Sequence, residues 1–77
     1  MKKSEITVGG IYTNGKGRIR KVVAEGAEYA LWDFMDKDFI RYEIIHDGTK
    51  VNNAKGELHN CSRASFASWA KERTDIK

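Results

Sequence analysis

The sequence predicts a mainly β protein of the α+β class. We expect a small SH3-like barrel, or a strongly bent antiparallel sheet of four or five strands, followed by one C-terminal α-helix. The sequence contains no proline, and its seven glycines divide the first sixty residues into short pieces whose length suits strands. The end of the chain changes to the three- and four-residue spacing of an amphipathic helix.

The length of 77 residues predicts a single domain over residues 1–77, with its strands within 6–61. A chain of this size buries only about 60% of the surface that it exposes when unfolded, which argues against a deep cleft between lobes. No apolar run approaches the ~18 residues of a membrane span, so no membrane partner is expected. The single cysteine, Cys61, allows no internal disulfide and indicates a reduced, cytoplasmic compartment.

Glycine turns are predicted to separate three strands in the first half of the chain. Ile11 and Tyr12 precede Asn14-Gly15, a favoured hairpin turn because both residues accept positive φ at little cost. A second strand is expected over 18–24 and a third over 28–34.

The second half carries the clearest strand pattern, over 39–46. One face of that strand is apolar and is predicted to be buried: Ile40, Tyr42 and Ile44. Residues 47–56 have no periodicity and are expected to form a mobile loop, and 57–61 a short last strand.

A helix is expected over about 62–74, with Ser62 as its N-cap. Four residues of that segment recur at helical spacing and define one face: Phe66, Trp69, Ala70 and Arg73. Aromatic residues at this spacing are typical of a core, so Phe66 and Trp69 are expected to pack against the sheet.

The formal net charge of +3 is distributed unevenly. Residues 1–24 carry six basic and one acidic side chain (+5), 25–48 carry two and seven (−5), and 49–77 carry six and three (+3). Pairing of oppositely charged strands explains this pattern. A basic surface patch that receives an anion is the alternative.

No motif in the sequence indicates catalysis. Residues 10–17 approach the phosphate-binding loop G-x-x-x-x-G-K-[ST], but Gly17 stands where the Mg²⁺-binding hydroxyl is needed, and a hairpin turn explains the glycines. Cys61, His46 and His59 share no metal-ligand spacing, and no two carboxylates form an evident acid–base pair. The sequence therefore predicts a protein that is not an enzyme, with no metal and no cofactor.

Cys61 is expected to be a buried structural residue at a strand–helix junction. Its position just before a helix N-terminus could also lower the pKa of its thiol.

Basic residues suggest a binding site instead. Arg18 and Arg20 project from the same face of a predicted strand, and Lys16 extends their row. Arg63 lies in the first turn of the predicted helix, where free N–H groups also favour anions. Guanidinium groups bind phosphate oxygens in a bidentate manner, so these residues are candidates for phosphate contacts.

An aromatic side chain, Tyr12 or Trp32, could add a stacking surface for a base. The alternative is that the arginines only keep an exposed strand soluble and unpaired. The candidate ligand-binding residues are Tyr12, Lys16, Arg18, Arg20, Trp32 and Arg63.

Three segments, 8–12, 17–23 and 61–70, resemble small uncharacterised proteins encoded by phages and prophages. The resemblance covers both ends of the chain and leaves its middle unmatched. It implies an SH3-like barrel and a viral accessory role in the cytoplasm of an infected bacterium. It implies no catalytic residue and no known activity.

Small phage accessory proteins without enzyme motifs often antagonise host defence. The first hypothesis is therefore a protein that binds and sequesters an anionic, nucleotide-type ligand, in a pocket that a homo-oligomer would complete. The alternatives are a small β-barrel that binds nucleic acid and an inhibitor that docks on a host defence protein.

Overall fold

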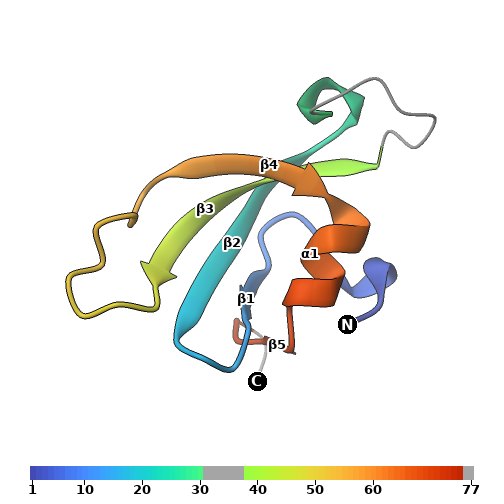
Figure 1. Ribbon diagram of the computed structural model, residues 1–77. Helices are drawn as coiled ribbons and strands as arrows, with labels where there is room; N and C mark the ends of the chain where they lie inside the picture. The colour runs from blue at the N-terminus through green and yellow to red at the C-terminus, as the bar shows by residue number, and fades with distance from the viewer. Residues whose placement is uncertain (31–37, 76–77) are drawn as a thin grey trace.

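The computed structural model of the chain describes residues 1–30 and 38–75 (Figure 1). Along the chain the elements are the 3-10 helix η1 (Lys3–Glu5), strands β1 (Ile11–Thr13) and β2 (Arg18–Glu25), the 3-10 helix η2 (Ala27–Tyr29), strands β3 (Phe39–Asp47) and β4 (Leu58–Ser62), helix α1 (Arg63–Trp69) and strand β5 (Glu72–Arg73).

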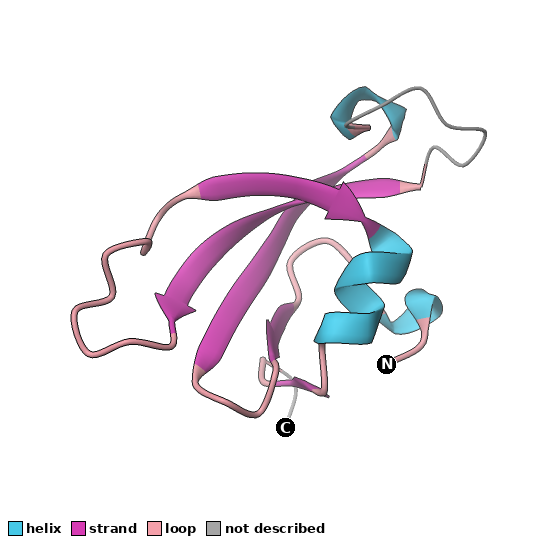
Figure 2. Cartoon of the chain, in the orientation of Figure 1, coloured by secondary structure: helices cyan, strands magenta, loops and turns pink. Residues whose placement is uncertain are grey.

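The strands form one antiparallel sheet in the order β4-β3-β2-β1-β5, with α1 following β4 (Figure 2). The expected fold class, a mainly β α+β protein with a C-terminal helix, is confirmed. Within the described ranges no helix is long and apolar enough to cross a membrane.

The expected third strand, over 28–34, is wrong at its start. Residues Ala27–Tyr29 form η2, in which the Tyr29 and Ala30 amides donate to the carbonyls of Gly26 and Ala27 at 3.2 and 3.1 Å. These short local bonds replace ladder bonds to a neighbouring strand. The rest of that prediction, 31–34, lies outside the described residues.

The helix is shorter than expected, because its last predicted turn becomes strand β5. The backbone at Ala70 is already extended (φ −73°, ψ 133°). The Lys71 amide then donates to Thr13 at 2.9 Å and the Thr74 amide to Ile11 at 2.7 Å. Pairing with the otherwise open edge of β1 satisfies backbone groups that a longer helix would leave unpaired on β1.

The core lies between α1 and the face of the sheet that carries the apolar side of β3. Ile40 and Tyr42 are buried there and Ile44 packs beside them, which confirms that predicted face. The remaining buried members of the cluster come from other elements: Ile6, Tyr12, Val22, Phe66, Ala67 and Ala70. Trp69 packs at its margin, so both aromatic residues of the helix face the sheet as expected.

Both ends of α1 are capped. Ser62 is the N-cap as predicted, and its hydroxyl accepts the Ser65 amide at 3.1 Å. At the other end the Met1 ammonium donates to the carbonyls of Ala67 and Ala70 at 2.9 and 3.2 Å. A cation near the last carbonyls of a helix stabilises it, so this contact from Met1, which precedes η1, helps to hold a helix of only two turns.

Tyr12 organises the N-terminal segment from inside the core. Its ring meets Phe66 edge to face with centroids 5.4 Å apart. Its hydroxyl donates to the Glu5 carbonyl at 2.7 Å and accepts the Thr7 amide at 2.9 Å. A β-carbon at Gly10 would overlap this ring, so Gly10 is required here for close approach and not only for a turn.

We expect Tyr12→Phe to lower the free energy of unfolding by about 1–3 kcal/mol, because it leaves the Thr7 amide and the Glu5 carbonyl without their partner in a partly buried place. Urea unfolding followed by circular dichroism measures the change. The control is Tyr42→Phe, since no hydrogen bond of the Tyr42 hydroxyl occurs within residues 1–30 and 38–75, and it should cost far less. Equal losses in the two variants would contradict the role given to the Tyr12 hydroxyl.

Candidate functional site

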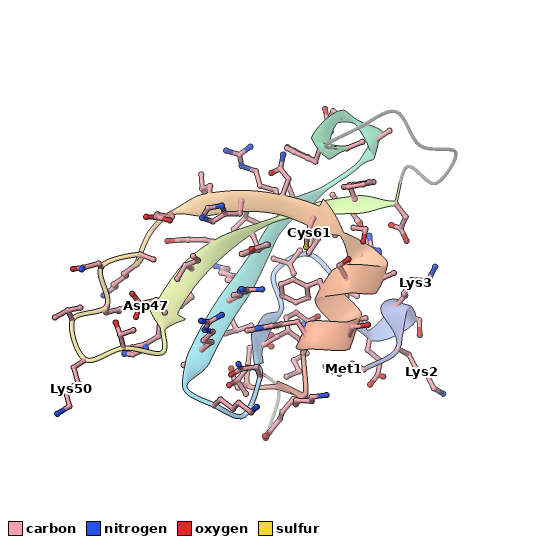
Figure 3. The ribbon with its side chains drawn as sticks, in the orientation of Figure 1. Met1, Lys2, Lys3, Asp47, Lys50 and Cys61 are labelled. Atoms are coloured by element: carbon pink, nitrogen blue, oxygen red, sulfur yellow. The ribbon has the colours of Figure 1, made fainter. Side chains whose placement is uncertain are left out.

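An open hollow of about 200 Å³ lies where β2 begins and β3 ends, beside the loop that follows β3. Figure 3 shows Asp47 at the end of β3, at the start of that loop. The residues that line the hollow are Arg18, Arg20, Ile44, His46, Asp47 and Ala54. Two of the predicted ligand-binding arginines therefore meet at one depression of the surface.

Arg20 is held by aromatic rings rather than by a carboxylate. Its guanidinium carbon lies 4.2 Å from the centroid of the Trp69 ring and 4.7 Å from that of Tyr42. Aromatic faces attract a guanidinium without neutralising its charge or occupying its N–H groups. Within the described parts of the chain Arg20 has no acidic partner, so its donors remain available to an anion.

Arg18 is exposed at the start of β2, and its side chain passes over Gly48. A β-carbon at Gly48 would lie 2.9 Å from Arg18 Cγ, and the φ of 85° there also favours glycine. The ladder between β2 and β3 shifts register between Ile19 and Arg20. The alternation of side chains between the two faces of β2, on which the sequence prediction depends, is therefore interrupted here. Both arginines nevertheless line the hollow.

His46 adds a hydrogen-bond donor to the wall. Its Nδ1 accepts the Gly48 amide at 3.0 Å. In the neutral ring the proton must then be on Nε2, because each nitrogen of a neutral imidazole is either donor or acceptor. The alternation of Ile40, Tyr42, Ile44 and His46 along one face of β3 is the sequence signal that could have placed this histidine here.

The one acid of the lining, Asp47, is engaged by the loop. Its carboxylate accepts the Thr49 amide and hydroxyl at 2.8 and 2.6 Å and the Ala54 amide at 3.1 Å. The Thr49 hydroxyl and these two amides lower the pKa of Asp47 to about 2, so it remains charged at neutral pH. Two arginines against one carboxylate leave the lining with a net charge of +1 when His46 is neutral.

Residues 47–56, which were expected to form a mobile loop, are held by specific hydrogen bonds. The side chain of Asn52 accepts the Asp47 amide at 2.8 Å and donates to the Ile45 carbonyl at 3.3 Å. The Gly56 amide donates to Ile44 at 2.7 Å. These bonds fix the rim of the hollow to β3.

Three of the predicted site residues lie elsewhere, and a fourth is not described. Tyr12 is completely buried, so the expectation that it stacks on a base is wrong. Lys16 is exposed in the hairpin turn and does not line the hollow. Trp32 lies outside the described residues.

Arg63 has a structural role in place of the predicted phosphate contact. Its side chain, 15% exposed, donates to Asp38 at 2.8 Å, to Glu25 and to the Ile6 carbonyl. Its own amide donates to the Asp38 carbonyl at 2.8 Å. These contacts raise the pKa of Arg63 further, so the charge is permanent but already paired.

Cys61 packs against the core, as expected of a structural residue, but it is only partly buried. Burial raises the pKa of its thiol to about 11, against the weaker lowering effect of Arg20. A backbone hydrogen bond from Phe66 of α1 also lowers this pKa, in the direction suggested from sequence, but removal from water outweighs it and the net pKa is raised. Across the described chain no three His, Cys, Asp or Glu side chains gather as metal ligands.

Comparison with known proteins adds no relative. No protein-family model, no curated protein and no solved structure matches the chain.

We expect Arg63→Ala to lower the free energy of unfolding by about 1.5–3 kcal/mol, because it removes hydrogen bonds to two carboxylates and a carbonyl. Arg18→Ala removes the same charge from an exposed site and should change stability by less than about 0.5 kcal/mol. Urea unfolding measures both. A neutral effect of Arg63→Ala would contradict its structural role.

We expect the Cys61 thiol to react with iodoacetamide at pH 8 much more slowly in the folded protein than in urea.

Between pH 9.0 and about 11 the unfolded Cys61 thiol loses a proton that the folded one retains, so the free energy of unfolding should fall as pH rises through this window. Tyr42, whose pKa burial also raises, adds to the same trend. Cys61→Ala should reduce the slope, and an unchanged slope would count against this assignment.

Proposed function

We propose that the protein is a non-enzymatic binding protein whose hollow receives a phosphate group of an anionic, nucleotide-type ligand. The observation that carries the proposal is the convergence of Arg18 and Arg20 on one hollow without any acidic partner for Arg20 in the described chain. Guanidinium groups match phosphate oxygens in charge and shape. His46 also lines the hollow, and because its Nδ1 accepts the Gly48 amide, its Nε2 is the ring nitrogen left for a ligand.

The size of the hollow limits what it encloses. Sites that surround a whole drug-sized ligand measure about 300–1,000 Å³, and this one measures about 200 Å³. The proposed ligand therefore places its phosphate in the hollow and the rest of its structure on the adjoining surface. A second copy of the chain could cover that part, which is why we retain a homo-oligomer in the proposal.

In biological terms we propose a phage accessory protein that antagonises host antiviral defence by sequestering such a ligand in the host cytoplasm. The support for this role is the resemblance of both ends of the chain to small phage-encoded proteins, together with the basic hollow. Binding alone removes a signalling nucleotide, so no chemical step is needed.

Nucleic acid is the second candidate, favoured by the same small volume. A hollow that holds a phosphate and leaves the base and sugar outside suits a polynucleotide as well as a free nucleotide. Contacts to several phosphates make affinity fall steeply with salt through counterion release. A single phosphate in the hollow predicts a shallower dependence.

We expect AMP or a cyclic nucleotide to bind with micromolar affinity, and the double change Arg18→Gln, Arg20→Gln to weaken it at least about tenfold, because charged hydrogen bonds are lost. Isothermal titration calorimetry measures both, and repeating it at several salt concentrations separates a nucleotide from a strand. Lys50→Gln is the control, because Lys50 is an exposed cation on the loop (Figure 3).

The proposal fails if no nucleotide or oligonucleotide binds more tightly than millimolar. It also fails if Lys50→Gln weakens binding as much as the double change, since the effect would then reflect net charge alone. Circular dichroism of each variant establishes that the fold is retained.

A further inference from the structure

We propose that His59 forms a second subsite, a platform on which the base of the bound nucleotide stacks. This inference rests on the proposed function, because it describes where the part of the ligand outside the hollow lies. It replaces Tyr12, whose ring is buried, as the stacking partner.

Arg20, Tyr42 and His59 form a continuous row across β2, β3 and β4. Tyr42 pairs with His59 across the β3–β4 ladder, so the two side chains share one face of the sheet. Their ring centroids are 5.8 Å apart with planes inclined by 33°. Arg20 lies over the same Tyr42 ring at 4.7 Å. The row therefore leads from the proposed phosphate site to His59.

Within this row only His59 offers a ring to an incoming base. Tyr42 is 9% exposed, and Arg20, Phe66 and His59 surround its ring. The His59 side chain is 47% exposed. The exposed part of this side chain is the surface that we assign to the base.

The imidazole is also held in position before any ligand arrives. Its Nε2 lies 3.0 Å from Glu57 Oε1, and the Tyr42 ring lies beside it with the centroids 5.8 Å apart. A ring that is already oriented loses little conformational entropy when a base stacks on it. Glu57 places a carboxylate beside this ring, so the platform would recognise an aromatic surface and leave the anion to Arg18 and Arg20.

The ligand chemistry implied is a nucleobase joined through a sugar to a phosphate. A free nucleotide and a nucleotide within a strand share this chemistry. Inorganic phosphate and ribose 5-phosphate possess only the part that the hollow would take, and they serve as probes that lack the base.

The test is calorimetric titration of AMP, ribose 5-phosphate and inorganic phosphate into the full chain and into His59→Ala. Stacking on an aromatic side chain is worth about 1–3 kcal/mol per base. The native chain should therefore prefer AMP over ribose 5-phosphate by at least about fivefold. His59→Ala should abolish that preference while leaving the affinity for ribose 5-phosphate unchanged.

Two further variants separate stacking from other effects. His59→Phe should retain the preference, because it keeps an aromatic ring and removes the imidazole nitrogens. Leu58→Ala is the matched control, since Leu58 is the adjacent residue of β4, is 48% exposed and should leave the preference unchanged. An adenylate tetramer that binds more tightly than AMP, with the same dependence on His59, identifies a strand as the source of the base; equal binding identifies a free nucleotide.

Equal affinities for AMP and ribose 5-phosphate overturn the platform but leave the phosphate hollow standing. A preference that survives His59→Ala also overturns it. If none of the probes binds the native chain, the proposed function fails and the platform fails with it.

Discussion

The contacts of Arg63 tie the start of α1 to three segments that are distant from it in sequence. One guanidinium joins the first residue of α1 to the carbonyl after η1, to the end of β2 and to the residue before β3. Two of these partners, Asp38 and Glu25, are carboxylates, and hydrogen bonds between a guanidinium and a carboxylate are among the stronger ones in proteins. They place α1 over one part of the sheet face, and the position of the helix decides which part of that face becomes core.

The uncovered part of the face is where a ligand site can form. Phe66 and Ala67 bury the sheet beneath the helix, whereas Trp69 at the helix end is only partly covered. Arg20 lies at this boundary, with aromatic rings of both elements beneath its guanidinium. The same packing that completes the core thus orients a cation without neutralising it. Core and candidate site are therefore coupled through Trp69 and Tyr42.

Local pattern was sufficient wherever one residue and its near neighbours decide conformation. The alternation of Ile40, Tyr42 and Ile44 and the cap at Ser62 were predicted from sequence and are confirmed. Local pattern failed where a distant segment competes for the same backbone. The spacing of Phe66, Trp69, Ala70 and Arg73 is helical, yet β1 pairs with the tail and converts its end to β5. Residue spacing contains no information about that open edge.

The sequence by itself determined the class of the fold, the buried face of β3 and the presence of arginines suited to phosphate. Only the tertiary structure decided which of these charges remain available. Arg18 and Arg20 line the hollow, whereas Arg63 forms ion pairs with Glu25 and Asp38. Tyr12 is buried in the core. The physical reason is that residues distant in sequence decide whether a charged side chain is paired and whether an aromatic ring is buried. Charge type is a local property, whereas pairing and burial belong to the folded chain.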